Sequence, residues 1–381
     1  MKWFWLACVH MALLFLSPMA AASPPAEGDS KFDILDYLIM DVCLDEHGAV
    51  IVGMSPADKA CVSRRNIKEG DPIPYHLVGV GPAAPCGQRV VLRDNVPWTH
   101  GDVTRVVGAV RIQKDSCDKK SPLIPAYYSV RWTDSQYAFI MGTWSRGPDG
   151  GKISGGATPA CADHADSSIR YFRNWVLSQT SGIANGTVGH AVFTKKGAFQ
   201  GLARPGTPCP ADYPARYLAL WSRGDFTFSS GQRLNAIISH PYSQANETGT
   251  SPGNGRQMER TYWTREFGQS RWENWKREDF VNKHVGKSAQ ELADGFFVNG
   301  VCSRPFEIAG NVTDGMNISP VEEHNGIYSQ IVTDIKTGEH HRWIMVGCQD
   351  TTAAVPALSP KGDAYPSTAP VTPVFWDFWK Q

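Results

Sequence analysis

The sequence lacks an excess of charge of either sign, a long apolar run outside its N-terminus, and the common metal and phosphate motifs. Its 381 residues carry 37 basic and 37 acidic side chains, mixed along the chain. Nucleic-acid binders usually carry a basic excess, so we expect no nucleic-acid partner. Beyond the first residues, no segment reaches the roughly 20 consecutive apolar residues of a membrane helix, which argues against an integral membrane anchor.

Several specific motifs are missing as well. The chain contains no H-E-x-x-H zinc helix, no phosphate-binding P-loop and no Asp-rich calcium loop. No two cysteines are as close as in C-x-x-C, the spacing typical of structural zinc. We therefore expect neither a metal nor another cofactor.

The N-terminus has the pattern of a secretory signal peptide. Lys2 precedes a largely apolar run at residues 3–16, and the small residues 20–22 follow. This order predicts a signal peptide over residues 1–22, with a mature chain that begins near Ser23. The protein is expected to be secreted or periplasmic.

The cysteines agree with export. Of the nine cysteines, Cys8 lies in the signal peptide, which leaves an even number in the mature chain. In an oxidising compartment such a set indicates disulfides. The pairing is not readable from the sequence, although Cys43 and Cys61 flank one corner of the chain and form a plausible bridge.

Short runs rich in Val, Ile, Tyr and Thr, separated by Gly, Pro, Asn and Ser, predict many strands. The expected strands lie at residues 102–113, 124–133, 136–144, 189–195, 215–222, 234–239, 259–267 and 271–277, with a hairpin of 327–336 and 341–348. Two more are expected on either side of a turn at residues 45–48. Residues 70–98 are rich in proline and are predicted to be irregular.

One longer helix is predicted over residues 163–179. Asp166 or Ser167 can cap its N-terminus, and apolar residues from Ile169 to Leu177 recur at helical spacing. A short helix is expected at 288–294. The pattern as a whole predicts a mostly β fold, an antiparallel sandwich or jelly-roll-like architecture with one packed helix and long loops, stabilised by disulfides.

We expect a single β-rich domain over residues 23–350. Residues 351–381 form a Pro-rich C-terminal extension that is predicted to pack back through the aromatic residues 374–379.

Residues 256–280 hold the densest group of aromatic and charged side chains. In one interpretation they line a sugar-binding cleft, because aromatic rings stack on pyranose faces while Arg and Glu bind hydroxyls or carboxylates. The substrate-binding residues would then be Tyr262, Trp263, Arg271, Trp272, Glu273 and Trp275. In the other interpretation the tryptophans are core residues and the charges pair on a solvated face.

Two chemistries are compatible with the candidate catalytic residues. His240 or Tyr242 as base or acid, with Arg265 or Arg271 neutralising a carboxylate, suits β-elimination of uronic acid units. A glycoside hydrolase instead needs two facing carboxylates, for which Glu266 and Glu273 are candidates.

The sequence therefore suggests a carbohydrate-active enzyme, a polysaccharide lyase or glycoside hydrolase, whose partner is a polysaccharide or other glycan. The alternatives are a non-catalytic carbohydrate-binding or cell-surface interaction protein, and a structural protein whose aromatic stretch is core. The sequence does not indicate an oligomeric state.

Overall fold

The computed structural model describes residues 32–68, 70–84, 87–100, 103–113, 123–133, 136–146, 152–154, 170–180, 182–196, 212–242, 257–284, 303–357 and 359–363. All elements named below lie in one compact unit, Asp33–Gln381. Among these residues, no helix has both the length and the apolar character to span a bilayer. The domain limits expected from the sequence stay predictions.

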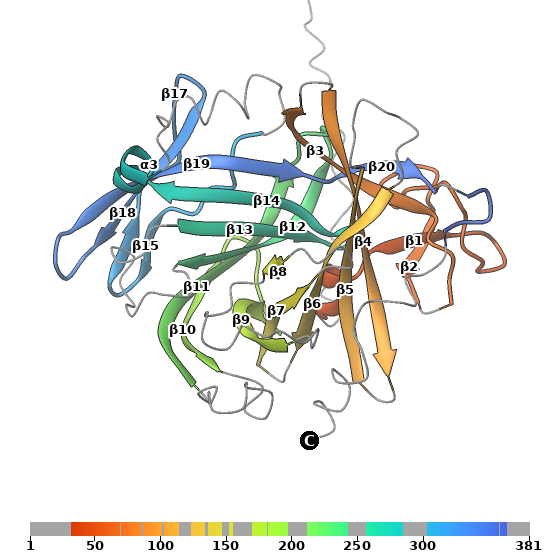
Figure 1. The fold of residues 1–381 in the computed structure, drawn as a ribbon, viewed down its shortest axis with the longest axis horizontal. Coiled ribbons are helices and arrows are strands. Elements are labelled where there is room, and N and C mark those ends of the chain that lie inside the picture. Colours follow the sequence, from red (N-terminus) through yellow and green to blue (C-terminus); the bar gives the residue numbers. More distant parts are fainter. Residues whose placement is uncertain are drawn as a thin grey trace, which may run out of the picture. The chain divides into compact units, whose positions relative to one another are not determined.

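The larger antiparallel sheet curls back toward its own beginning (Figure 1). Its strands follow the order β10 (Val188–Lys196), β11 (Asp212–Thr227), β12 (Arg233–Tyr242), β13 (Gln257–Thr264), β14 (Gly268–Arg277), β19 (His340–Asp350), β18 (Ile327–Asp334), β16 (Met316–Ile318) and β15 (Gly310–Thr313), and β17 (Glu322–His324) pairs with β18. The two end strands, β10 and β15, contact each other. The sheet is therefore nearly closed, like a barrel, whereas the sandwich or jelly-roll arrangement is not confirmed.

A second antiparallel sheet packs on the outside of this curled sheet. Its strands are β20 (Ala353–Pro356), β3 (Tyr75–Ala84), β4 (Gly87–His100), β5 (Val103–Gln113), β6 (Leu123–Thr133), β7 (Tyr137–Arg146) and β8 (Lys152–Ser154), with β9 (Arg170–Gln179) paired to β7. Strand β9 lies against β10, β11 and β12. One direct link is the Ser239 hydroxyl, which donates to the Leu177 carbonyl at 2.6 Å.

The described chain begins with a small disulfide-closed unit. Helix α1 (Leu35–Leu38) leads into the hairpin of β1 (Asp41–Leu44) and β2 (Ser63–Asn66), and the Cys43–Cys61 bridge joins its ends, as the sequence suggested. The expected turn after β1 is confirmed by the Gly48 amide, which donates to the Asp45 carbonyl. Cys348 is also disulfide-bonded.

Most predicted strands are confirmed, including the hairpin of β18 and β19. At the N-terminus the two expected strands are only partly correct, because residues 35–38 are helical and Val50 makes just an isolated bridge to Leu44. A further short helix, α3 (Glu278–His284), ends the aromatic stretch. The helix expected at 288–294 lies outside the described residues.

The helix predicted over residues 163–179 is wrong where the structure describes it, because residues 170–179 form strand β9. Leu177 and Ser178 are adjacent and both buried, so β9 is covered on both faces at this end. A strand covered on both faces need not alternate apolar and polar residues, and its pattern can match helical spacing by chance. The expected N-cap residues Asp166 and Ser167 lie outside the described part.

The irregular segment predicted over 70–98 is also wrong, because it contains β3 and most of β4. Pro82 lies where the register between β3 and β4 shifts, between Val80 and Ala83. A bulge of this kind tolerates a residue without an amide donor. Proline content alone was therefore a poor sign of irregular structure here.

The inner face of the curled sheet forms the main core. Its buried members include three methionines, two tryptophans and several aliphatic residues, among them Leu220, Ile238, Met258, Tyr262, Trp275, Met316, Val332, Trp343 and Met345. Polar groups are embedded in this core, among them the side chains of Arg271 and Glu273.

Candidate functional site

The aromatic stretch folds into the hairpin of β13 and β14, joined by a turn at residues 265–267. Strand alternation turns Tyr262 and Trp275 into the core, and both rings are fully buried. Trp263 is buried as well, and its indole N–H donates to the Thr261 hydroxyl at 3.1 Å. Trp272 is only half-buried. For Trp263 and Trp275 this burial favours the packing interpretation over sugar stacking.

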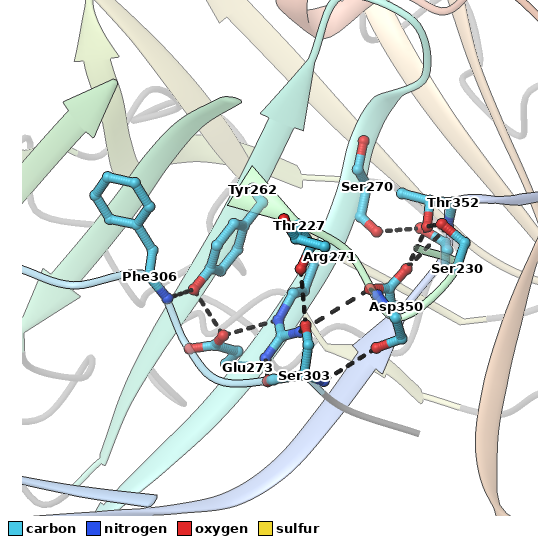
Figure 2. Close-up of polar contacts among 12 residues, drawn as sticks. Thr227, Ser230, Tyr262, Ser270, Arg271, Glu273, Ser303, Phe306, Asp350 and Thr352 are labelled. Carbon is cyan, nitrogen blue, oxygen red and sulfur yellow. Dashed lines mark hydrogen bonds and ion pairs between the residues drawn. The ribbon is translucent and has the colours of Figure 1, made fainter. Parts of the chain in front are cut away.

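A polar network centred on Arg271 and Glu273 is built into the core (Figure 2). The Glu273 carboxylate accepts from Arg271 Nε at 2.8 Å, from the Tyr262 hydroxyl at 2.7 Å and from Trp275 Nε1 at 2.9 Å. Arg271 Nη1 and Nη2 donate to the hydroxyl and carbonyl of Ser303 at 2.9 and 2.7 Å. Both charged side chains are fully buried.

The ionisation of this network is fixed by its burial. Burial opposes the charge on Arg271, but Glu273, Tyr262 and Asp350 together more than offset it, so the pKa of Arg271 is raised. Burial and the Glu273 carboxylate raise the pKa of Tyr262, which stays a neutral phenol. Tyr262 of β13 and Asp350 of β19 both contact the Arg271–Glu273 pair on β14, so the network links three neighbouring strands. The predicted substrate-binding roles of Arg271 and Glu273 find no support in this arrangement.

Asp350 ties the network to the end of β19. Its carboxylate lies 3.9 Å from Arg271 Nη1 and accepts from the Ser229 amide at 2.8 Å and the Thr352 hydroxyl at 2.6 Å. The Ser230 and Thr352 hydroxyls are 2.8 Å apart, which extends the chain of contacts toward the surface (Figure 2). These bonds join the β11–β12 turn to β19.

His240 lies on β12 and is fully buried, with its Nε2 against the Met258 sulfur. Burial, with a smaller contribution from the Arg260 charge, lowers the pKa of His240 well below its ordinary value. The imidazole is therefore neutral and shielded from solvent, which does not favour the general-base role. Tyr242 also lies on β12, but its side chain is outside the described part of the structure.

A different arrangement occurs at the β13–β14 turn, where Glu266 and Asp41 share Arg64. Arg64 Nη1 donates to Glu266 Oε1 at 2.9 Å, and Arg64 Nε lies 3.5 Å from Asp41 Oδ2. The Asp41 and Glu266 side chains are 11% and 13% exposed, and Arg64 is 37% exposed. The backbone fixes the pair, because the Asp41 amide donates to the Glu266 carbonyl at 2.9 Å.

The two carboxyl groups of this pair differ in their surroundings. Burial, opposed by Arg64 and reinforced by the charge of Glu266, raises the pKa of Asp41 to about 7. Asn66 Nδ2 donates to Asp41 Oδ1 at 3.0 Å. Glu266 has the closer contact to Arg64, whereas its Oε2 is buried without a hydrogen-bond partner. A carboxyl group with a raised pKa beside a second carboxylate is typical of sites for acid–base catalysis.

Arg265 and Asp36 border the pair on the side of α1. Arg265 Nη2 lies 3.5 Å from Asp36 Oδ2, and the Arg265 guanidinium lies 5.6 Å from the centre of the Tyr37 ring. The Arg265 side chain is 34% exposed, so it can reach solvent beside the carboxylates. Burial raises the pKa of Asp36, in spite of Arg265.

Sequence reasoning selected Arg265 and Glu266 but missed Asp41 and Arg64. These two residues lie on β1 and β2, and their place beside Glu266 follows from long-range docking that no local pattern encodes. The one available signal was the predicted Cys43–Cys61 corner, which brings the ends of β1 and β2 together. The proposed partner Glu273 lies in the core network, with partners other than those of Glu266.

Among the residues that the structure describes, no group of three His, Cys, Asp or Glu side chains is arranged to hold a metal ion. Comparison with protein-family models, curated proteins and solved structures gives no match.

Proposed function

We propose that the protein is an exported carbohydrate-active enzyme that hydrolyses glycosidic bonds, with Asp41 as general acid and Glu266 as the second carboxylate. One observation carries this proposal: two largely buried carboxyl groups share the partly exposed Arg64, and burial raises the pKa of Asp41 to about 7. A glycosidase needs one protonated and one ionised carboxyl group on the two sides of the scissile bond.

In this mechanism Asp41 protonates the leaving-group oxygen, because its raised pKa keeps the proton available near neutral pH. Glu266, paired with Arg64, either activates a water molecule or attacks the sugar. Arg265, beside the pair and partly exposed, contacts hydroxyl or acidic groups of the glycan. Trp272, the least buried of the three tryptophans considered, remains a candidate stacking ring.

Hydrolysis is preferred over β-elimination for a geometric reason. Of the groups expected for elimination, His240 is fully buried, and the donors of Arg271 are taken by Glu273 and Ser303, while the side chain of Tyr242, the other expected base, lies outside the described part of the structure. Export is supported by the predicted signal peptide and by the Cys43–Cys61 disulfide.

The test is to incubate the purified mature protein with neutral and acidic polysaccharides and to follow both reducing ends and the ultraviolet absorbance of unsaturated uronates. We expect new reducing ends without that absorbance. Asp41→Asn and Glu266→Gln should each lower the rate on the order of 10²–10⁴-fold. Glu339→Gln, an exposed carboxylate of the β18–β19 turn, is the matched control and should keep full activity.

Unsaturated products would instead establish a lyase. Full activity in both carboxylate variants would rule out the proposed pair. If every polymer is retained on the protein but remains intact, the non-catalytic carbohydrate-binding alternative is the better description.

A further inference from the structure

Tyr75 is the first residue of strand β3 in the second sheet, and it is buried. Its hydroxyl donates to the Asp41 carbonyl at 2.7 Å and lies 3.3 Å from the Glu266 carbonyl. Because a phenol carries one proton, the shorter contact is the principal bond and the longer contact shares the same proton. The Tyr75 ring makes an edge contact with Phe267, with ring centres 6.2 Å apart. Tyr75 therefore contacts the main chain of both residues that carry the paired carboxyl groups.

A direct hydrogen bond and the Tyr75 hydroxyl together join the main chains of Asp41 and Glu266. The Asp41 amide donates to the Glu266 carbonyl at 2.9 Å, which joins β1 to the β13–β14 turn. By itself, one hydrogen bond lets two segments pivot about it. The Tyr75 hydroxyl contacts the carbonyls of both residues from a third segment, β3, and so restrains this pivoting.

The C-terminal segment of the described chain fixes the position of Tyr75. Pro356 of β20 pairs with Tyr75 in the register of the two strands. Further along the chain, the amide and carbonyl of Asp363 bond to the carbonyl and amide of Ile73, each at 3.0 Å. The Asp363 carboxylate also contacts the imidazole of His76, which is fully buried. Residues on both sides of Tyr75 are therefore bonded, so its hydroxyl projects from a fixed backbone.

We propose that Tyr75 is the positioning residue of the candidate site, whose hydroxyl holds the Asp41 and Glu266 carboxyl groups at one separation beside Arg64. The hydroxyl is buried and its proton is donated to main-chain carbonyls, so Tyr75 orients the pair and does not itself contact substrate. The separation of two carboxyl groups decides how a glycosidase can act, and small displacements of catalytic groups slow catalysis strongly. The catalytic meaning of this inference rests on the proposed hydrolase.

The titration of Asp41 tests this positioning without any substrate. Carbon NMR follows its side-chain carboxyl group across the pH range in the wild type and in Tyr75→Phe, and Asp41→Asn assigns the signal. The charged side chains that act on this carboxyl group are Arg64, Glu266, Asp36 and Arg265. Tyr75→Phe keeps the ring and removes only the hydroxyl, so Asp41 should be less confined beside Glu266 and its pKa should fall from about 7 toward 3.8. The same Asp41 pKa in both proteins would overturn the positioning role.

Activity gives a second readout. Tyr75→Phe should lower kcat on the order of 10–10²-fold and leave KM within about twofold, because the pair is displaced while the substrate contacts remain. Ser239→Ala is the matched control, because it also removes a buried hydroxyl that donates to a main-chain carbonyl, that of Leu177. The control should keep the kcat and the Asp41 pKa of the wild type. A loss of kcat in Tyr75→Phe no greater than in Ser239→Ala would contradict the role of Tyr75.

The wild type alone provides a third measurement, which does not depend on a variant that folds. The Tyr75 hydroxyl proton is buried and donated, so it should exchange slowly with water and give its own proton NMR signal. Exchange as fast as that of a free phenol would overturn the positioning role. A wild type that hydrolyses no polysaccharide would count against the hydrolase, whereas the Asp41 titration and the hydroxyl signal would still decide the role of Tyr75.

Discussion

Asp41 combines two properties at the scale of a single residue, a backbone position fixed by hydrogen bonds and a carboxyl group that resists ionisation. Its carbonyl accepts from the Tyr75 hydroxyl at 2.7 Å, and its amide donates to Glu266. Its side chain is held beside Glu266 and near Asp36, so a negative charge on Asp41 meets two others. Ionisation of Asp41 therefore destabilises the folded state, and the carboxyl group stays protonated to a higher pH than usual.

Stability should consequently fall as the pH rises. In the unfolded chain Asp41 ionises near 3.8, whereas in the folded chain the pKa is about 7. Between these values the unfolded state releases the proton and the folded state retains it, so this contribution to stability is complete below 3.8 and is lost as the pH rises toward 7. A tenfold change in proton affinity is worth about 1.4 kcal/mol, which sets the loss on the order of 4 kcal/mol at most.

Asp41→Asn removes this titration. We expect the variant to be more stable than the wild type by about 1–4 kcal/mol at pH 8 and nearly equal to it at pH 4, as measured by urea unfolding across this range. A stability difference that does not change with pH would show that Asp41 ionises normally in the folded protein. Under the proposed function the same variant is inactive, so it would gain stability while losing activity.

The sequence supplied part of the candidate site at this scale. Arg265 and Glu266 were identified because charges and aromatic rings cluster in one stretch; the turn leaves Arg265 34% exposed and Glu266 13% exposed. The burial of Trp263 and Trp275 agrees with the core interpretation of this stretch, but the sequence did not decide between the two interpretations, because local composition does not show which face of a strand meets a second layer.

At the scale of single elements, the pairing of β10 and β11 depends on a glycine, because the Trp221 ring of β11 lies against Gly189 of β10. Gly189 pairs with Trp221, and a Cβ added at Gly189 would lie 2.1 Å from Trp221 Nε1. The Trp221 ring also makes an edge contact with Tyr137 of the second sheet, with ring centres 6.1 Å apart. The absence of a side chain at residue 189 therefore determines where this tryptophan lies between the two sheets.

Gly189→Ala should be destabilising by about 1–3 kcal/mol, the usual cost of overpacking a tight contact. Gly315→Ala is the matched control, because its added Cβ would meet nothing closer than Lys336 Cε at 3.7 Å. We expect the control to change stability by less than about 1 kcal/mol in the same urea titration. Equal effects of the two substitutions would mean that Trp221 moves aside without cost.

Hairpins were the elements best predicted from the sequence. The hairpin of β18 and β19 combines strand-forming residues with the turn residue Gly338, whose φ of +74° suits glycine. Strand β9 was mistaken for a helix because its identity depends on pairing with β7 and on cover from the other sheet. Such non-local contacts override short-range spacing.

At the scale of the whole molecule, the strands in the middle of the curled sheet are hydrogen-bonded along most of their length, whereas the end strands form fewer strand-pairing hydrogen bonds. Strand β14 pairs along most of its length with both β13 and β19, whereas β15 pairs with the three-residue strand β16 and only contacts β10. The charged network around Arg271 lies at this centre (Figure 2). Its bonds join β13, β14 and β19.

The rate of amide hydrogen exchange should increase from the fully paired middle strands of the curled sheet to its end strands. We expect the amides of β13, β14 and β19 to exchange slowest, through global unfolding, and those of β15 and β17 to exchange fastest. Mass spectrometry of peptides from deuterated protein measures the exchange rates of both groups of strands. Equal protection of β15 and β14 would show that β15 is bonded on both sides, so that the sheet is fully closed.

The mostly β, antiparallel class followed from composition and spacing, but the curling of one sheet did not. Closure depends on β10 meeting β15, strands more than one hundred positions apart in sequence. Local propensity contains no information about such a pairing.

The Cys43–Cys61 disulfide has a further consequence for where the protein can act. The bridge closes a loop with a sequence separation of 18, and Asp41 and Arg64 lie just outside its two ends. Under the proposed function, formation of the Cys43–Cys61 bond keeps the general acid Asp41 next to Arg64, which also contacts Glu266. A newly made chain in a reducing cytoplasm lacks this covalent constraint, so the enzyme would be latent inside the producing cell and would mature only after export.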